Sequence, residues 1–200
     1  MWRRRSLIWE MPLSYRKQRA NGSKSFTEEP SFRKGTTVGV TETLEIFPLK
    51  VLRDLIQLNF LRIPARPGAT RPLFDLLERH NVSVKFLLEG CTGDFNRDLV
   101  ICIVQDGFSR LEPELKEVAN RMQAQAVEVR RSVAVIRVLG PHFDIRPGTS
   151  GLLFEALDRA GITVLSIATT ITSSMLVIPN DQVAAAERVI GRTFDVPKKK

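Results

Sequence analysis

The chain repeats itself with a period of eighty residues, and this repeat limits its fold more than any other feature. Residues 66–79 and 146–159 both start with Arg-Pro-Gly. Both continue with a Leu-Phe-acidic triplet, a further Leu and an acidic-Arg pair. The same register extends from Leu55 and Val135 to Val84 and Val164. Because short apolar matches do not keep one register over roughly thirty positions by chance, the chain is predicted to be a tandem of two homologous units.

Each unit begins with the same succession of patterns. Residues 54–61 and 133–139 are rich in β-branched and apolar side chains and are predicted strands. A Pro-Gly loop follows each strand, and then a helix with one apolar stripe. Asn81 and Gly161 are suited to end these two helices. The pattern therefore predicts a strand, a tight turn and an amphipathic helix in each unit.

The remaining patterns complete a β-α-β-β-α-β order. Further strands are predicted over residues 82–89, 99–104, 127–130, 162–169 and 175–178, and further helices over 111–125 and 181–193. This order predicts an α+β fold of two ferredoxin-like units, each an antiparallel four-stranded sheet with two helices on one face.

The second unit lacks a last strand of its own, since only a few residues follow Thr193 before the terminal lysines. A sheet edge would then stay unpaired. The apolar segment 42–52 is predicted to fill this place, with Pro48 near its end or at a sheet edge. The predicted division is a basic, disordered leader over 1–41, a first unit over 53–131, a second unit over 42–52 and 132–195, and a basic tail over 196–200. The first unit is thus predicted to be inserted into the second.

The formal net charge of +8 belongs mostly to the two ends of the chain. Residues 1–38 hold nine basic and three acidic side chains, and the chain ends in three lysines, which leaves residues 39–197 close to neutral. The basic leader, with Trp2 and Trp9, favours RNA or an anionic surface as one alternative. The neutral body makes nucleic-acid binding the less favoured interpretation.

Several other classes are disfavoured by composition. No apolar stretch approaches the roughly 18 residues of a membrane span, so no membrane association through a span is expected. Cys91 and Cys102 form neither a disulfide framework nor a metal motif, which indicates a reducing, cytoplasmic setting. With two histidines and no nucleophile-base pair, metal cluster or phosphate loop of recognisable spacing, the chain is predicted to be no enzyme and to need no cofactor or metal.

These residues resemble ACT domains, and in particular the tandem pair at the C-terminus of aspartate kinases. The resemblance covers about residues 42–195. It is carried by residues 55–62 and 64–68 in the first unit, and by 133–139, 147–148, 153–154, 160–164 and 175–178 in the second. Since 41 residues before the repeat are too few for a nucleotide-binding domain, the chain is similar to a free-standing regulatory portion.

The resemblance implies a ligand site where the strand-to-helix loop of one unit meets a neighbouring sheet. A helix N-terminus suits the carboxylate of an amino acid, and a glycine lets the ligand approach the backbone. The residues expected to bind the ligand are Ala65, Arg66, Pro67, Gly68, Ala69, Ser83, Glu89, His142, Asp144, Pro147, Gly148, Thr149, Thr163 and Thr169.

This chain departs from the family pattern where the ligand's ammonium group is bound. Ala65 replaces an Asp of the first loop, Ser83 and Lys85 replace an Asn and an Asp of the next strand, and Glu89 replaces a Gln. The family's lysine or threonine specificity is therefore not carried over. Glu89 or Asp144 is expected to meet the ammonium group instead.

The first hypothesis is a non-catalytic, allosteric regulatory module that binds a small amino-acid-like effector and signals through the arrangement of its subunits. A homodimer is expected, with a regulated enzyme as a further partner. The alternative is an ACT-fold dimerisation or assembly module with a vestigial ligand site, which Ala65, Ser83 and Lys85 favour. The least favoured alternative is nucleic-acid binding through the basic N-terminus.

Overall fold

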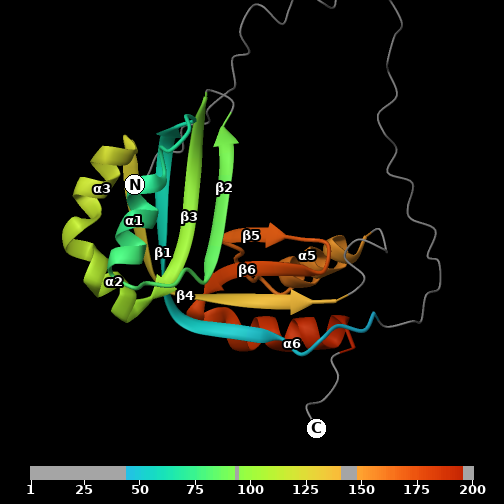
Figure 1. The fold of residues 1–200 in the computed structure, drawn as a ribbon. Helices are drawn as coiled ribbons and strands as arrows, with labels where there is room; N and C mark the ends of the chain where they lie inside the picture. The colour runs from blue at the N-terminus through green and yellow to red at the C-terminus, as the bar shows by residue number, and fades with distance from the viewer. Residues whose placement is uncertain (1–43, 93–94, 141–147, 196–200) are drawn as a thin grey trace, which may run out of the picture. The chain divides into compact units, whose positions relative to one another are not determined.

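The computed structural model describes residues 44–92, 95–140 and 148–195, and all of them belong to one compact unit. Its strands form one antiparallel sheet in the order β2-β3-β1-β4-β6-β5 (Figure 1). The strands are β1 (Lys50–Pro64), β2 (Phe86–Thr92), β3 (Asn96–Val104), β4 (Ala126–Leu139), β5 (Ser166–Thr169) and β6 (Ser173–Pro179). The predicted α+β, ferredoxin-like fold is confirmed.

Two groups of helices cover the sheet, one against each set of outer strands (Figure 1). The first group is α1 (Arg71–Arg79), α2 (Gln105–Leu111), the 3₁₀ turn η2 (Glu112–Glu114) and α3 (Leu115–Met122). The second group is α5 (Thr149–Arg159), the 3₁₀ turn η3 (Asn180–Gln182) and α6 (Val183–Thr193). Asn81 and Gly161 follow α1 and α5 with positive φ angles of 51° and 68°, which confirms them as the residues that end these helices.

Strands β1 and β4 run through both halves of the sheet and bend where the halves meet. Asp54 has a φ of 55° and Ser132 a φ of 56°, and the pairing of β1 with β4 shifts register between Leu52 and Leu55. Bulges of this kind turn a strand without ending it. The prediction of separate strands over 127–130 and 133–139 is therefore wrong, because one bent strand contains both.

The two ends of β1 have different neighbours. Its residues 55–64 lie between β3 and the start of β4, while Lys50–Leu52 pair with Arg137, Ile136 and Val135 at the other end of β4. Just before β1, Ile46 is 1% exposed among side chains of the second half, and the Phe47 amide donates to the Leu139 carbonyl at 2.8 Å. These contacts support the proposed assignment of residues 42–52 to the second unit, which stays a proposal.

Three hydrophobic cores hold the fold together. The first core lies between α1–α3 and the sheet and includes Phe60, Leu73 and Phe108. The second core lies beneath α5 and α6 and includes Ile46, Leu153 and Ile190. The third core lies between the two halves of the bent sheet, where the helix-free face of one half meets that of the other. Its buried members are Leu55, Phe86, Cys102, Val133, Val135 and Val177. The two units are thus packed on each other and not merely linked.

The elements differ from prediction where local chemistry interrupts a pattern. In place of one helix over 111–125, the structure has α2, the η2 turn and α3 in succession. Pro113 lies inside η2, and because it has no N–H it cannot donate the backbone hydrogen bond that a continuous helix needs. The strand predicted from residue 82 begins at Phe86, since Val82 still donates its amide to the Leu77 carbonyl at the end of α1.

Candidate functional site

The two predicted ligand loops lead into their helices through glycines with positive φ. Gly68 has a φ of 76° and Gly148 a φ of 94°, and a Cβ atom at either position would find open space. The glycines therefore serve the backbone conformation and leave the helix start accessible. Ala69 and Thr149 follow them and are buried, so these two predicted contacts face the protein interior.

The helices that follow begin without a negative charge. Neither α1 nor α5 has an acidic residue in its first turn. The Thr70 side chain makes no capping hydrogen bond at α1, and the N-cap residue of α5 is Gly148, which has no side chain to cap with. Helix N-termini present backbone N–H donors and partial positive charge. At α1 the amides of Arg71 and Leu73 already donate to the carbonyls of Gly68 and Thr70 at 3.1 Å, and Pro72 between them has no N–H. The start of α5 is therefore the more favourable of the two places for the carboxylate of a small ligand.

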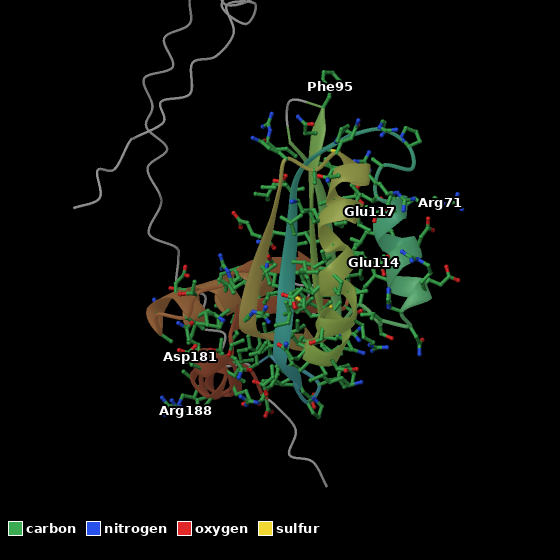
Figure 2. The ribbon with its side chains drawn as sticks, turned by 90° about the vertical axis from the view of Figure 1, so that its left-hand side faces the viewer. Arg71, Phe95, Glu114, Glu117, Asp181 and Arg188 are labelled. Carbon is green, nitrogen blue, oxygen red and sulfur yellow. The ribbon has the colours of Figure 1, made fainter. Side chains whose placement is uncertain are left out.

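The loop of the first unit is tied to its surroundings on both sides. The Ala65 amide donates to the Phe95 carbonyl at 2.8 Å, and Arg66 donates from Nη2 to Oε1 of Gln123 at 3.2 Å. Phe95 is 90% exposed and projects from the turn between β2 and β3, while Arg71 lies at the start of α1 (Figure 2). Despite the hydrogen bonds of Ala65 and Arg66, the loop residues Arg66, Pro67 and Gly68 remain exposed.

The other predicted residues lie at two opposite ends of each unit. The register places Thr92 level with Pro64, where the first loop begins, and Phe86 at the far end of β2. Glu89 is three residues, about 10 Å, along the strand from the loop end, and exposed Ser83 precedes the far end. In the second unit, Thr169 likewise lies toward the loop end and Thr163 precedes the far end of β5. One ligand cannot touch both ends of a single unit.

Several of these polar groups already have partners. Glu89 accepts a hydrogen bond from Nη1 of Arg97 at 2.5 Å, the hydroxyls of Thr169 and Ser174 are 3.1 Å apart, and the Thr163 amide donates to Gln182 at 2.7 Å. Three predicted contacts, His142, Asp144 and Pro147, lie outside the described residues. The prediction that Glu89 meets an ammonium group thus requires it to share or leave Arg97.

An ion cluster joins the end of α1 to the η2 turn, and no sequence pattern signals it. Nε2 of His80 lies 2.6 Å from Oε1 of Glu114, and Nη2 of Arg79 lies 2.9 Å from Oε2. Glu114 lies on the side of η2 that faces α1 (Figure 2). The hydrogen bond with His80, followed by that with Arg79, lowers the pKa of Glu114 below its ordinary value of 4.5.

Replacing Glu114 with Gln is expected to make stability less sensitive to acid. A depressed folded-state pKa contributes stability above the unfolded value of 4.5, and that contribution is lost as the pH falls through the folded-state value. The free energy of unfolding of the wild type should therefore fall more steeply below about pH 4.5 than that of Glu114→Gln. Urea unfolding at a series of pH values measures this. Glu117→Gln on the exposed side of α3 controls for the loss of one negative charge, and parallel curves for Glu114→Gln and wild type would contradict the prediction.

The two cysteines differ sharply in accessibility. Cys102 is fully buried in the third core and burial raises the pKa of its thiol to about 12, whereas Cys91 is exposed on β2. One thiol per native chain is expected to react with iodoacetamide, and two after denaturation, as counted by mass spectrometry. Cys91→Ser should leave no rapidly reacting thiol in the native protein, and rapid native labelling of Cys102 would contradict the burial argument.

Neither metal binding nor a membrane span is indicated in the part of the chain that the structure describes. It contains no group of three or more His, Cys, Asp or Glu side chains that could hold a metal ion. None of its helices is long and apolar enough to cross a membrane.

Comparisons with known proteins bear on the family. No family model matches the chain. An aspartokinase of Thermus thermophilus is 25% identical over 151 residues, which are 72% of this chain and 36% of the relative. The chain therefore spans about a third of the length of that relative.

Solved structures show the same fold. The regulatory subunit of aspartate kinase from Thermus thermophilus, in a ligand-free form, matches with a TM-score of 0.62 and 21% identity, over 77% of this chain and 100% of the other. E. coli aspartokinase III in complex with lysine and aspartate matches with a TM-score of 0.58 and 16% identity, over 78% of this chain and 34% of the other. The chain is a homologue of aspartokinases, and its described residues have the tandem ACT fold of their regulatory region.

Proposed function

We propose that this protein is a non-catalytic, cytoplasmic regulatory module that binds a small amino-acid-like effector and reports its presence to a partner enzyme or to its own oligomer. The likeness to a regulatory subunit of aspartate kinase supports the regulatory role. The observation that carries the proposal is the pair of equivalent helix starts behind Gly68 and Gly148. Both are accessible, and neither has an acidic side chain in its first turn.

The effector's carboxylate is proposed to bind at these helix starts, where the helix dipole favours an anion and where, at α5, backbone amides are also suited to bind it. Its ammonium group needs an acceptor, and Glu89 is the proposed one in the first unit, provided that it is shared with Arg97. A similar structure was determined with lysine and aspartate, which supports the amino-acid class. Ala65, Ser83 and Lys85 depart from the family pattern, so the proposal does not extend to lysine itself.

A homodimer is part of this proposal. Within one unit the loop residues and Ser83 or Thr163 lie at opposite ends of the sheet. A single ligand can touch both sets only where two units, or two copies of the chain, bring unlike ends together. Effector binding would then favour one subunit arrangement by its differential affinity, which is the requirement for an allosteric signal.

Calorimetric titration of the chain with each of the twenty amino acids at millimolar concentration tests the effector. At least one is expected to give saturable heat. Gly151 and Gly191 form a matched pair, because both lie in helices and a Cβ at either would meet open space. Gly151→Phe fills the space at the start of α5 and should weaken binding about tenfold or more, whereas Gly191→Phe near the end of α6 should not. A folded protein that gives no heat with any amino acid would overturn the proposal.

A second candidate function is an assembly module without an effector. The Arg97–Glu89 ion pair favours it, because Arg97 already binds the Glu89 carboxylate that was expected to accept the ligand's ammonium group. This candidate predicts a stable dimer in the absence of ligand and no thermal shift with any amino acid. An amino-acid-dependent rise in melting temperature, which mass action requires of a true ligand, would exclude it.

A further inference from the structure

A groove opens beside α3 in the first half of the fold. It has a volume of about 390 Å³ and lies between α2, α3 and the first residues of β4. Its apolar lining comes from Phe108, Leu115, Ala119, Val127 and Val129. Ligand pockets in proteins span about 300–1,000 Å³ and are lined mostly by apolar side chains, so a groove of this size suits a small molecule. We call it the α3–β4 groove.

The second half of the fold has large buried side chains in the corresponding place. Phe194 directly follows α6 and is 1% exposed in the second core. Ile46 belongs to the same core, and its amide donates to the Asp195 carbonyl at 2.8 Å. The residues that follow α3 in the first half include Ala124 and Ala126, which are too small to fill the equivalent space. The groove is therefore a property of this stretch of sequence and not of the fold in general.

The charges at the rim of the α3–β4 groove leave one cation without a counter-charge. The guanidinium of Arg131 lies 4.7 Å from the centre of the Phe108 ring and bonds Glu112 at 3.3 Å, so these two charges neutralise each other. Lys116 is exposed at the same rim, and no other described residue forms a hydrogen bond or ion pair with its ammonium group. The rim thus has one net positive charge beside an apolar floor.

Two side-chain amides lie at the rim with this cation. Asn120 is four residues after Lys116 and therefore one turn away on the same side of α3. Gln125 lies in the connection from α3 to β4 and also lines the groove. Within the described ranges neither side-chain amide has a hydrogen-bond partner. An ammonium group and an amide one turn apart can donate to the two oxygens of a single carboxylate.

We propose that the α3–β4 groove is a second ligand site, which binds a small apolar monocarboxylate. The carboxylate bonds Lys116 and Asn120, and the apolar body of the ligand lies against Leu115, Ala119 and Val127. One uncompensated cation favours a ligand with one negative charge. Among the groove's lining residues Glu112 is the sole carboxylate, and Arg131 already neutralises it, so the groove does not favour a ligand with an additional ammonium group.

This inference goes beyond the proposed function and does not rest on it. The proposed effector has both a carboxylate and an ammonium group, and it binds at the helix starts behind Gly68 and Gly148. The α3–β4 groove lies at the other helix of the first unit and takes a different class of molecule.

Hexanoate is the probe for the ligand class. Its titration into the ¹⁵N-labelled full chain is expected to give saturable amide shifts within residues 108–129. Hexan-1-ol and hexylammonium are matched molecules of zero and opposite charge. Both should bind at least about fivefold more weakly, because neither offers a carboxylate to Lys116. Equal affinity for hexanoate and hexan-1-ol would overturn the role of the carboxylate.

Two variants with matched controls test the residues. Lys116→Met keeps an apolar side chain but removes the charge, and should weaken hexanoate binding about fivefold. Lys50→Met removes an equally exposed charge from the other half and should have no effect. Val129→Trp fills the groove and should weaken binding about tenfold or more. Leu52→Trp is its control, since Leu52 and Val129 are both strand residues with 43% of their surface exposed. Circular dichroism checks the fold of each variant.

Gly151→Phe at the start of α5 separates this inference from the proposed function. It is expected to leave hexanoate binding unchanged. Loss of hexanoate binding in Gly151→Phe, with normal binding in Val129→Trp, would place the probe at the proposed effector site and overturn the inference alone. No saturable shifts at millimolar hexanoate would also overturn it. Hexanoate binding that Lys116→Met and Val129→Trp weaken, in a chain that binds no amino acid, would support the groove and overturn the proposed function alone.

Discussion

Replacing Ile46 with Ala is expected to lower the free energy of unfolding by about 2–5 kcal/mol. Ile46 is 1% exposed and packs in the second core, beneath α5 and α6. Removing its side chain both loses apolar burial and leaves a cavity that the surrounding helices fill only in part. Urea denaturation measures the loss, and hydrogen exchange should place it in α5 and α6 although Ile46 precedes the first unit in the chain.

Phe47 is the matched control for this experiment. It is the next residue, but it is 58% exposed. Phe47→Ala should therefore change the free energy of unfolding by no more than about 0.5 kcal/mol. If Ile46→Ala were as mild as Phe47→Ala, or if its effect on exchange fell in α1 and α3, the assignment of residues 42–52 to the second unit would be wrong.

Replacing Phe86 with Ala is expected to cost about 3–5 kcal/mol and to uncouple the two units. Phe86 is 2% exposed in the third core, where it packs with Cys102, Val135 and Val177. Since this core lies between the helix-free faces of the two halves of the sheet, removing the Phe86 side chain weakens the contact between the units more than it weakens either unit itself. Thermal unfolding followed by calorimetry should change from one transition to two.

Leu87 provides the comparison on the same strand. Its side chain points to the opposite face and is 43% exposed, so Leu87→Ala should keep a single transition near the wild-type temperature. A single transition in Phe86→Ala, shifted downward but not divided, would mean that the shared strands β1 and β4 couple the units without help from the third core.

The repeat made the architecture predictable from sequence because it showed each pattern twice. The Pro-Gly loops, the apolar stripes of α1 and α5, and Asn81 and Gly161 at the helix ends all follow from local backbone and burial preferences. The bends in β1 and β4 were not predicted. Asp54 and Ser132 hold positive φ angles there, which Asp adopts more often than most residues but which neither residue type requires. Pro113, by contrast, was a visible reason to break the helix predicted over 111–125.

The candidate site was less predictable than the fold. A strand-to-helix loop and the following helix-to-strand connection lie at opposite ends of any such unit, so the separation of Gly68 from Ser83 was implicit in the β-α-β order. The engagement of Glu89 by Arg97 and the meeting of His80 with Glu114 depend on pairing between elements. Residue types alone do not reveal which charges a fold neutralises.

The parallel bridge between Glu45 and Asp195 has a consequence for how this chain can be rewired. The Asp195 amide donates to the Leu44 carbonyl at 2.9 Å, so the two ends of the described fold are hydrogen-bonded neighbours. A circular permutant can join these ends and open the chain at the Ser132 bend. Its sequence would run through all segments of the proposed second unit first and then through the first unit. If residues 42–52 belong to the second unit as proposed, the two units would become consecutive in the chain, with the same contacts between side chains and only the order of the segments changed.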